Sequence, residues 1–451
     1  MWSTGTKLRN VTQRQNNDEE LGKFCRALFA YRYKRVGKLP VKKGCLPMNR
    51  WKRIIAHIHT HRQLFLLLAI GGLYSLSIAL SNTFVNVYVW KKVNSFHALG
   101  VYNLAIVTWQ PLAFIVAGKI AKKIDRVIVL RMGVTFLALF FLVVLFSGNR
   151  AMDHLFFLGG LLGVGYGFYW LAFNVLTFEI TEPNTRDLFN GLLGAMTSVA
   201  GMIGPPLAGW VIASSEKFTG YMAIFLASLC LFIAAVILSF FLHRRGSSGR
   251  FALRSAYDER KKNKNWKMIT NAHFFQGFRE GTFVFIVSIF LFITTGTEKA
   301  LGVFGFINAI VSFMTYSFAS KYIKQRWRLH AILFGGVLLY ASVFLLVFDL
   351  SYTKLMIYGA LIAVGYPILL VPYLSLTFDV IGQSNHAKEW RIEYIVMREL
   401  FLNGGRATSV LLFLLAITLF DAKEAIPLLM LIVGSGHFII YFFVRHIRLS
   451  M

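Results

Sequence analysis

Four charged residues lie at helical spacing in a segment that leads directly into an apolar stretch: Glu393, Arg398, Glu399 and Arg406. Arg406 falls near the middle of any membrane span drawn from about 396 to 420. A charged side chain at mid-bilayer costs at least ~3 kcal/mol, so such residues normally face the interior of a helix bundle or a watery cavity. The sequence therefore predicts a functional site in this segment.

Arg406 has no carboxylate obviously at its depth elsewhere in the apolar segments. A deep, unpaired guanidinium suits a ligand carboxylate or phosphate, because its planar fork makes two parallel hydrogen bonds that lysine cannot copy. An anionic or zwitterionic substrate follows as a hypothesis, and Asn403 and Gln276 are predicted to bind it together with Arg406.

A second polar segment opens the apolar stretch 272–295 and brings Arg279 and Glu280 to the membrane edge. The Arg398–Glu399 dipeptide enters the membrane in the same way. Two Arg-Glu dipeptides at similar depth predict a crossed pair of salt bridges that forms a gate, closed in one state and open in another. Purely structural pairing of the two arginines is the alternative.

Energy coupling is expected to come from protons, because the chain has no Gly-x4-Gly-Lys-Ser/Thr pattern for ATP. Buried carboxylates are the usual proton carriers, which makes Glu280 and Glu399 the candidates. Glu179 and Asp379 lie at span ends that water reaches, and a gate or helix-end role is predicted for them. No cofactor is expected, and no metal site is predicted.

Apolar residues make up 56% of the 451 residues, which excludes an ordinary soluble domain. Stretches of about 20 apolar residues, the length that crosses a bilayer, predict an all-α polytopic membrane protein. Twelve transmembrane helices are expected, at 64–90, 97–121, 129–148, 155–178, 189–213, 219–242, 272–295, 300–320, 329–349, 354–378, 396–420 and 425–444. The 48 Lys and Arg residues lie mostly on one side of these spans, which the positive-inside rule explains without nucleic-acid binding. Both termini are therefore expected in the cytosol.

The sequence divides into two six-helix halves that repeat each other. Val164-Gly165-Tyr166 recurs as Val364-Gly365-Tyr366, and residues 176–179 recur at 376–379 with the same offset. This parallel duplication predicts a site at the midplane between the halves. The expected domains are a basic cytosolic tail, a first bundle, a cytosolic linker, a second bundle and a cytosolic C-terminus, at 1–63, 64–243, 244–271, 272–445 and 446–451.

Polar residues inside the spans are candidates for lining a central cavity: Asn86, Tyr166, Asn174 and Tyr366. The alternative for each of them is a hydrogen bond between neighbouring helices.

Over residues 64–445 the chain resembles the major facilitator superfamily, and it is identified as a bacterial-type member. The loop from Gly118 to Arg126 is similar to a cytosolic signature of that superfamily, with Lys122 where its Asp stands and Asp125 where its second Gly stands. The resemblance implies a charge relay that gates the cytosolic side. Gly191, Gly204, Pro205 and Gly209 are similar to the Gly-Pro signature of the antiporters of the superfamily, whereas tight helix packing alone is the other interpretation.

The sequence therefore predicts a secondary active transporter of the cell membrane that works by alternating access, is coupled to protons and carries a small anionic or amphiphilic solute. It is expected to act as a monomer in the lipid bilayer, and not as an enzyme. A flippase for a lipid or a lipid-linked headgroup is the alternative within transport. A polytopic membrane enzyme and a scaffold or sensor that transports nothing are the alternatives from other classes.

Overall fold

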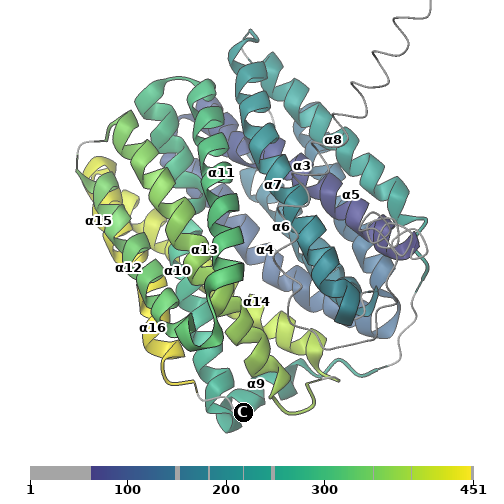
Figure 1. Ribbon diagram of the computed structural model, residues 1–451. Helices are drawn as coiled ribbons and strands as arrows, with labels where there is room; N and C mark the ends of the chain where they lie inside the picture. Colours follow the sequence, from purple (N-terminus) through teal and green to yellow (C-terminus); the bar gives the residue numbers. More distant parts are fainter. Residues whose placement is uncertain are drawn as a thin grey trace, which may run out of the picture. The chain divides into compact units, whose positions relative to one another are not determined.

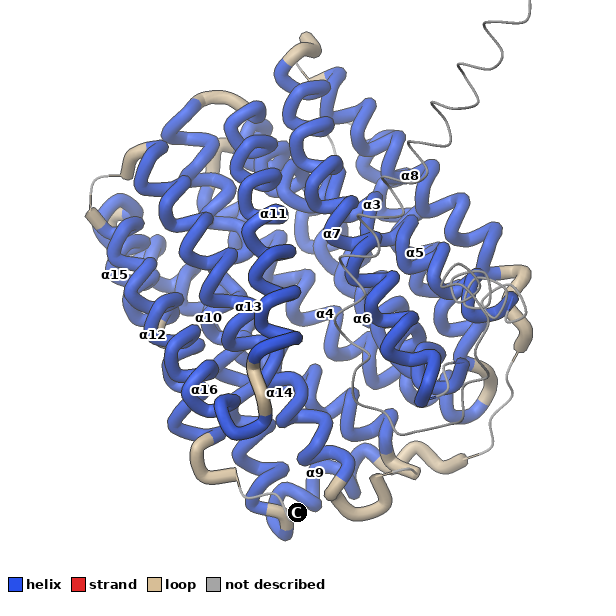
Figure 2. Tube along the Cα trace, in the orientation of Figure 1, coloured by secondary structure: helices blue, strands red, loops and turns tan. Residues whose placement is uncertain are grey.

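Apolar helices make up almost all of the described chain. The computed structural model describes residues 62–147, 153–180, 183–216, 218–244, 249–348, 350–387 and 389–447, which lie in one unit, Ile58–Met451. Within them it has twelve helical segments long and apolar enough to cross a membrane, and no strand (Figure 2). The predicted all-α class and the number of spans are confirmed. The predicted tail, 1–63, lies outside the described residues apart from its last two.

The first half contains six spans: α3 (Arg62–Val93), α4 (Phe96–Lys123), α5 (Arg126–Ser147), α6 (Leu155–Ile180), α7 (Pro183–Ala213) and α8 (Thr219–Ser239). The second half contains α10 (Lys264–Thr295), α11 (Glu298–Tyr322), α12 (Arg328–Val347), α13 (Tyr352–Gly382), α14 (Arg391–Leu419) and a last span formed by α15 (Ala422–Gly434) and α16 (Gly436–Val444). Outside these spans lie the linker helix α9 (Leu253–Lys262) and a short 3-10 turn, η2 (Gln325–Trp327).

Short polar caps explain how spans can follow each other after only two residues. Ser95 and Thr297 accept hydrogen bonds from the first free N–H groups of α4 and α11, and Asp421 does so for α15. Gly296 ends α10 with φ +66°, a conformation that favours glycine. Successive spans run in opposite directions. We call the end that carries α9 and the C-terminus the linker face, and the opposite end the far face (Figure 1).

Three of the spans begin at least five residues before their predicted starts, among them α7, which begins at Pro183 instead of 189. Helix α10 begins at Lys264 instead of 272, and α14 at Arg391 instead of 396. Hydropathy does not detect the first turns of these helices, because those turns are polar and lie outside the membrane although they are helical. Trp266 is fully buried and packs edge-on against Tyr394, so the extra turns hold each other.

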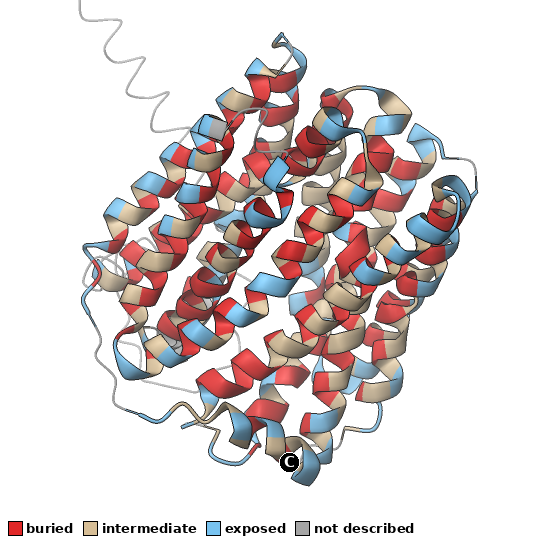
Figure 3. Cartoon of the chain, turned by 180° about the vertical axis from the view of Figure 1, so that it is seen from behind, coloured by how far each residue is buried: buried red, intermediate tan, exposed pale blue. Residues whose placement is uncertain are grey.

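The two halves are packed alike, as their internal repeat requires. In the first half α3 packs on α7, α4 on α6 and α5 on α6; in the second half α10 packs on α14, α11 on α13 and α12 on α13. Buried residues follow the facing sides of these helices (Figure 3). Between the halves, α4 packs on α14 and α7 on α11, two contacts that the repeat exchanges. A site between the halves is therefore walled by equivalent helices from both.

Candidate functional site

The central feature is an ion pair between α10 and α14. Arg406 donates from Nη2 to Oε2 of Glu280 at 2.5 Å, and from Nε to the same oxygen at 3.1 Å. The prediction of an unpaired guanidinium is therefore wrong. Drawing the span from 272 placed Glu280 near the membrane edge, whereas in α10 as it forms Glu280 lies as far from the helix start as Arg406 does in α14.

Glu280 is surrounded by polar side chains from four helices, and side chains of three of them, α10, α13 and α14, donate hydrogen bonds to it. Its Oε1 accepts from Gln276 Nε2 at 2.9 Å and from the Tyr366 hydroxyl at 3.1 Å, while His437 Nε2 lies 4.0 Å away. Arg406 donates further to Asn403 Oδ1 at 3.3 Å. Charge-assisted hydrogen bonds of this kind are the strong ones, so the carboxylate is held as an anion in one place.

Arg406 remains partly accessible within this network. Its side chain is 25% exposed, against 13% for Glu280. Asn403, one turn earlier on the same side of α14, is fully buried and donates to the carbonyl oxygen of Glu399 at 3.0 Å. The partners of Arg406 therefore do not cover its side chain completely.

The predicted crossed pair of salt bridges is also wrong. Arg398 pairs with its neighbour Glu399 at 2.5 Å. Arg279 donates to the Tyr358 hydroxyl at 3.3 Å and lies 4.6 Å from the centre of the Phe283 ring. Successive helix residues point about 100° apart, so the two charges of an Arg-Glu dipeptide leave the helix in different directions. Within the described residues, no carboxylate lies within 4.0 Å of Arg279.

Two buried histidines that the sequence analysis did not single out belong to the network. His273 Nδ1 lies 2.9 Å from Gln276 Oε1, and its Nε2 lies 3.2 Å from the Thr377 hydroxyl. His437 is fully buried against Tyr366. The signal for His273 was available: residues 273, 276 and 280 recur at i, i+3 and i+7, which places them on one face of α10.

The polar candidates of the first half stay apart from this network. The Tyr166 hydroxyl donates to Asn82 Oδ1 at 3.3 Å, and Asn174 is half-buried. Asn86 is buried and accepts from Asn103 at 2.9 Å, the interhelical hydrogen bond that was its alternative interpretation. Of the predicted binding residues, the structure brings together those of the second half: Arg406, Asn403, Gln276 and Tyr366.

At the linker face one ion pair joins the two halves. Lys122 of α4 lies 2.9 Å from Glu393 of α14 and donates to the Glu389 carbonyl oxygen at 2.6 Å. The same Glu393 carboxylate accepts from the backbone N–H of Ala252 in the linker at 3.1 Å. Gly118 packs so closely on the side chains of Phe251 and Val396 that a Cβ added at Gly118 would be crowded by them. The predicted loop motif therefore meets the second half through Lys122, a partner that sequence reasoning did not find.

The helix-end charges pair within each half. Arg126 lies 2.9 Å from Glu179, and Arg328 lies 2.6 Å from Asp379, so each half has an arginine–carboxylate pair at the equivalent helix ends. Asp125 accepts from the backbone N–H of Val127 at 2.6 Å.

A second ion pair joins the halves at the far face. Lys91 of α3 lies 2.7 Å from Glu298 of α11, and the Tyr221 hydroxyl donates to the same carboxylate oxygen at 2.8 Å. This pair was hard to predict from the sequence, because Lys91 looks like an ordinary charged residue of a loop. In the part of the chain that the structure describes, each face therefore carries a lysine–glutamate pair between the halves.

The Gly-Pro motif of α7 packs only over its far-face half. Gly204 faces Ala79, whereas Pro205 and Gly209 face α11 around Gly302. Gly191 has nothing within 4 Å of an added Cβ, so its predicted packing role is wrong. Figure 1 shows that α7 and α11 diverge toward the linker face.

Comparisons with known proteins give a family and a fold. The family model of the Major Facilitator Superfamily matches residues 67–388. The chain is 57% identical over 401 residues to Uncharacterized protein YqgE of Bacillus subtilis (strain 168), covering 89% of this chain and 93% of the relative. It is 59% identical over 180 residues to the Uncharacterized protein in sodM 3'region of Geobacillus stearothermophilus, covering 40% of this chain and 84% of the relative. Among solved structures, the human organic anion transporter MFSD10 (TETRAN) is similar in fold, with TM-score 0.61 and 14% identity, over 85% of this chain and 99% of that one.

Proposed function

Because the chain belongs to the Major Facilitator Superfamily, a superfamily of membrane transporters, we propose that it is a proton-coupled transporter of a small anionic or amphiphilic solute. The observation that carries this proposal is the Glu280–Arg406 pair, which lies near the middle of two spans and is partly accessible. Ionisable residues at this depth are costly and mark a pathway for a substrate or a proton.

The pair supplies a simple coupling chemistry. While Glu280 is ionised it neutralises Arg406, so a substrate anion would gain little free energy by binding there. A proton on Glu280 removes that partner and leaves the guanidinium with an uncompensated charge, which costs about 3–5 kcal/mol for a buried pair. A substrate carboxylate or phosphate then restores neutrality by taking two hydrogen bonds from Arg406. The proton and the anion are therefore bound together and cross the membrane in the same direction.

The first half offers no charge to such a solute. Tyr74 and Tyr169 stack at 3.9 Å inside the buried core, and Trp170 stands edge-on to both rings with 38% of its surface exposed. No charged residue was found at mid-span in the described part of this half. The organic anion named for the human structure of similar fold is of the charge class proposed here.

Alternating access would use the two ion pairs between the halves. We assign the linker face to the cytosol, because the linker 244–267 carries nine Lys and Arg against two acidic residues. The Lys122–Glu393 pair would open when the site faces the cytosol fully, and the Lys91–Glu298 pair when it faces outward.

Proteoliposomes with a trapped pH dye test the proposal. A panel of small organic anions should produce substrate-dependent proton movement with the native chain and none with Arg406→Ala. Glu280→Gln mimics the protonated carboxyl, so it should lose proton movement but keep exchange of labelled for unlabelled substrate. Glu424→Gln, which removes an exposed far-face carboxylate, is the control and should behave as the native chain. Undiminished proton movement in Glu280→Gln would refute this coupling.

A flippase for a lipid or lipid-linked headgroup is the second candidate. Exposed apolar residues at the linker-face end of α11 favour this function: Met314 is 66% and Phe318 54% exposed. They lie beyond the part of α11 that packs on the Gly-Pro motif of α7. A lipid entering from the side would pass there. Transfer of a headgroup-labelled lipid between leaflets, without response to small anions, would select this function over the first.

A further inference from the structure

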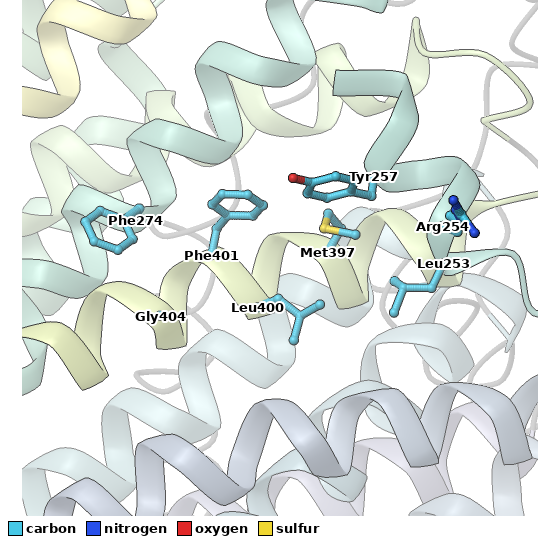
Figure 4. A pocket seen from close by; sticks show the side chains of 8 residues that line it. All are labelled: Leu253, Arg254, Tyr257, Phe274, Met397, Leu400, Phe401 and Gly404. Atoms are coloured by element: carbon cyan, nitrogen blue, oxygen red, sulfur yellow. The ribbon is translucent and has the colours of Figure 1, made fainter. Parts of the chain in front are cut away.

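A groove of about 570 Å³ lies between α9, α10 and α14, outside the network just described. Apolar side chains line most of it. Figure 4 shows Phe274, Phe401 and Met397 along the spans, with Gly404 at their end, and Tyr257 and Arg254 at the end formed by α9. The lining therefore changes from apolar to charged along its length.

The position of the groove on α14 shows which way it faces. Met397, Phe401 and Gly404 lie on the side of this helix away from Asn403 and Arg406, because these sets are offset by roughly half a turn. The groove thus faces the surrounding bilayer, not the space between the halves. From Met397 to Gly404 it follows α14 for about 10 Å at 1.5 Å per residue.

The charged end of the groove is rigid. Trp266 donates from its indole N–H to the Ala256 carbonyl oxygen at 2.9 Å, fixing α9 to α10. Arg260 donates to Thr270 at 2.9 Å and Asn271 at 2.7 Å, and its guanidinium lies 4.1 Å from the centre of the Phe401 ring. This end of the groove is therefore part of the folded second half.

The same end carries unneutralised positive charge. The Arg254 side chain is 96% exposed, and its nearest carboxylate, Asp258, lies 4.0 Å away and is itself closer to Lys261, at 2.9 Å. Nine of the residues 244–267 are cationic and two are acidic. A ligand that spans this groove needs an apolar chain at one end and an anion at the other.

We propose that the groove is a binding site for one anionic phospholipid, with an acyl chain along Phe274 and Phe401 and the phosphate beside Arg254. A lipid in the linker-face leaflet fits this groove, because the groove faces the bilayer and lies at the level of that leaflet. Its lining also changes from apolar to charged in the direction that runs from the acyl chain to the phosphate of such a lipid. The bound lipid bridges α9 and α14. It also stabilises the linker-face pair, because Ala252, next to α9, donates to Glu393.

Photo-crosslinking of the full chain identifies the occupant directly. With p-benzoylphenylalanine in place of Phe401, in vesicles of phosphatidylglycerol and phosphatidylcholine, phosphatidylglycerol adducts should exceed their share of the vesicle by roughly fivefold, the factor for one nearby cation. The same photo-residue in place of Phe334, an exposed apolar residue of α12, should report the vesicle composition. Equal composition at both positions, or crosslinks from position 401 to a peptide, would overturn the proposal.

Two matched pairs of variants complete the test. Arg254→Gln should abolish the enrichment, whereas Lys262→Gln removes the same charge from the other end of α9 and should leave it intact. Gly404→Leu fills the groove and should reduce both the adduct and the thermal stabilisation by phosphatidylglycerol. Gly404→Ala, whose added Cβ meets only Phe274 at 3.9 Å, should reduce neither. Unchanged enrichment in both Arg254→Gln and Gly404→Leu would count against the site.

Discussion

Removing Arg406 and Glu280 singly and together measures how strongly they depend on each other. Arg406→Gln leaves the Glu280 carboxylate with donors from Gln276 and Tyr366, and among the described residues only His437 then has a basic nitrogen within 4.0 Å of it. Breaking one side of a buried pair costs about 3–5 kcal/mol, because the remaining charge stays uncompensated. The pair is partly exposed, so we expect a loss near the lower end, about 3 kcal/mol of unfolding free energy.

The double variant carries the decisive result. Arg406→Gln combined with Glu280→Gln removes both charges and keeps hydrogen-bonding amides, so it should be less destabilised than either single variant. The coupling energy from this cycle should be about 2 kcal/mol or more. Unfolding by sodium dodecyl sulfate in mixed micelles, followed by circular dichroism, measures each free energy. Losses that add within about 0.5 kcal/mol would refute the pair as a coupled unit.

Two further predictions concern the packing and the movement of the halves. Gly277→Ala should lower the unfolding free energy by about 2 kcal/mol or more, because its Cβ would collide with the Leu402 carbonyl oxygen of the adjoining helix; thermal unfolding beside the native chain checks this. Lys91→Gln should weaken the far-face contact by about 1 kcal/mol and shift the chain toward its outward-open state. A cysteine at position 191, where an added Cβ meets no neighbour, reports this shift: in the Lys91→Gln background the rate of thiol labelling of Gly191→Cys should fall by up to about fivefold. An unchanged labelling rate would show that the Lys91–Glu298 pair does not bias the equilibrium between the two states.

Hydropathy and the internal repeat were enough to predict the architecture. Twelve spans, two similar halves and the basic linker all follow from composition at the scale of a whole helix. The helix ends were less accurate, because α10 continues into the polar residues around Lys264 with Asn263 as its cap. A polar helical turn outside the membrane leaves no hydropathy signal.

The pairing of charges could not be predicted in the same way. Glu280 and Arg406 are 126 residues apart, and their contact depends on the relative depth of two helices whose starts were misplaced by different amounts. The crossed pair failed for another reason: Arg398 pairs with its own neighbour Glu399, and Arg279 contacts Tyr358 and Phe283. The structure brings the predicted polar residues of the second half together, and it adds His273, whose helical spacing was a usable signal, and His437, which had none.

The location of the charged network within one half has a thermodynamic consequence. Glu280, Tyr366, Arg406 and His437 all belong to spans of the second bundle, so a rigid rotation of the two halves leaves their mutual distances unchanged. The affinity of the pair for a proton would then be similar whichever side it faces. Under the coupling proposed above, transport would be reversible, and the gradients of proton and solute would decide whether the cell takes the solute up or expels it.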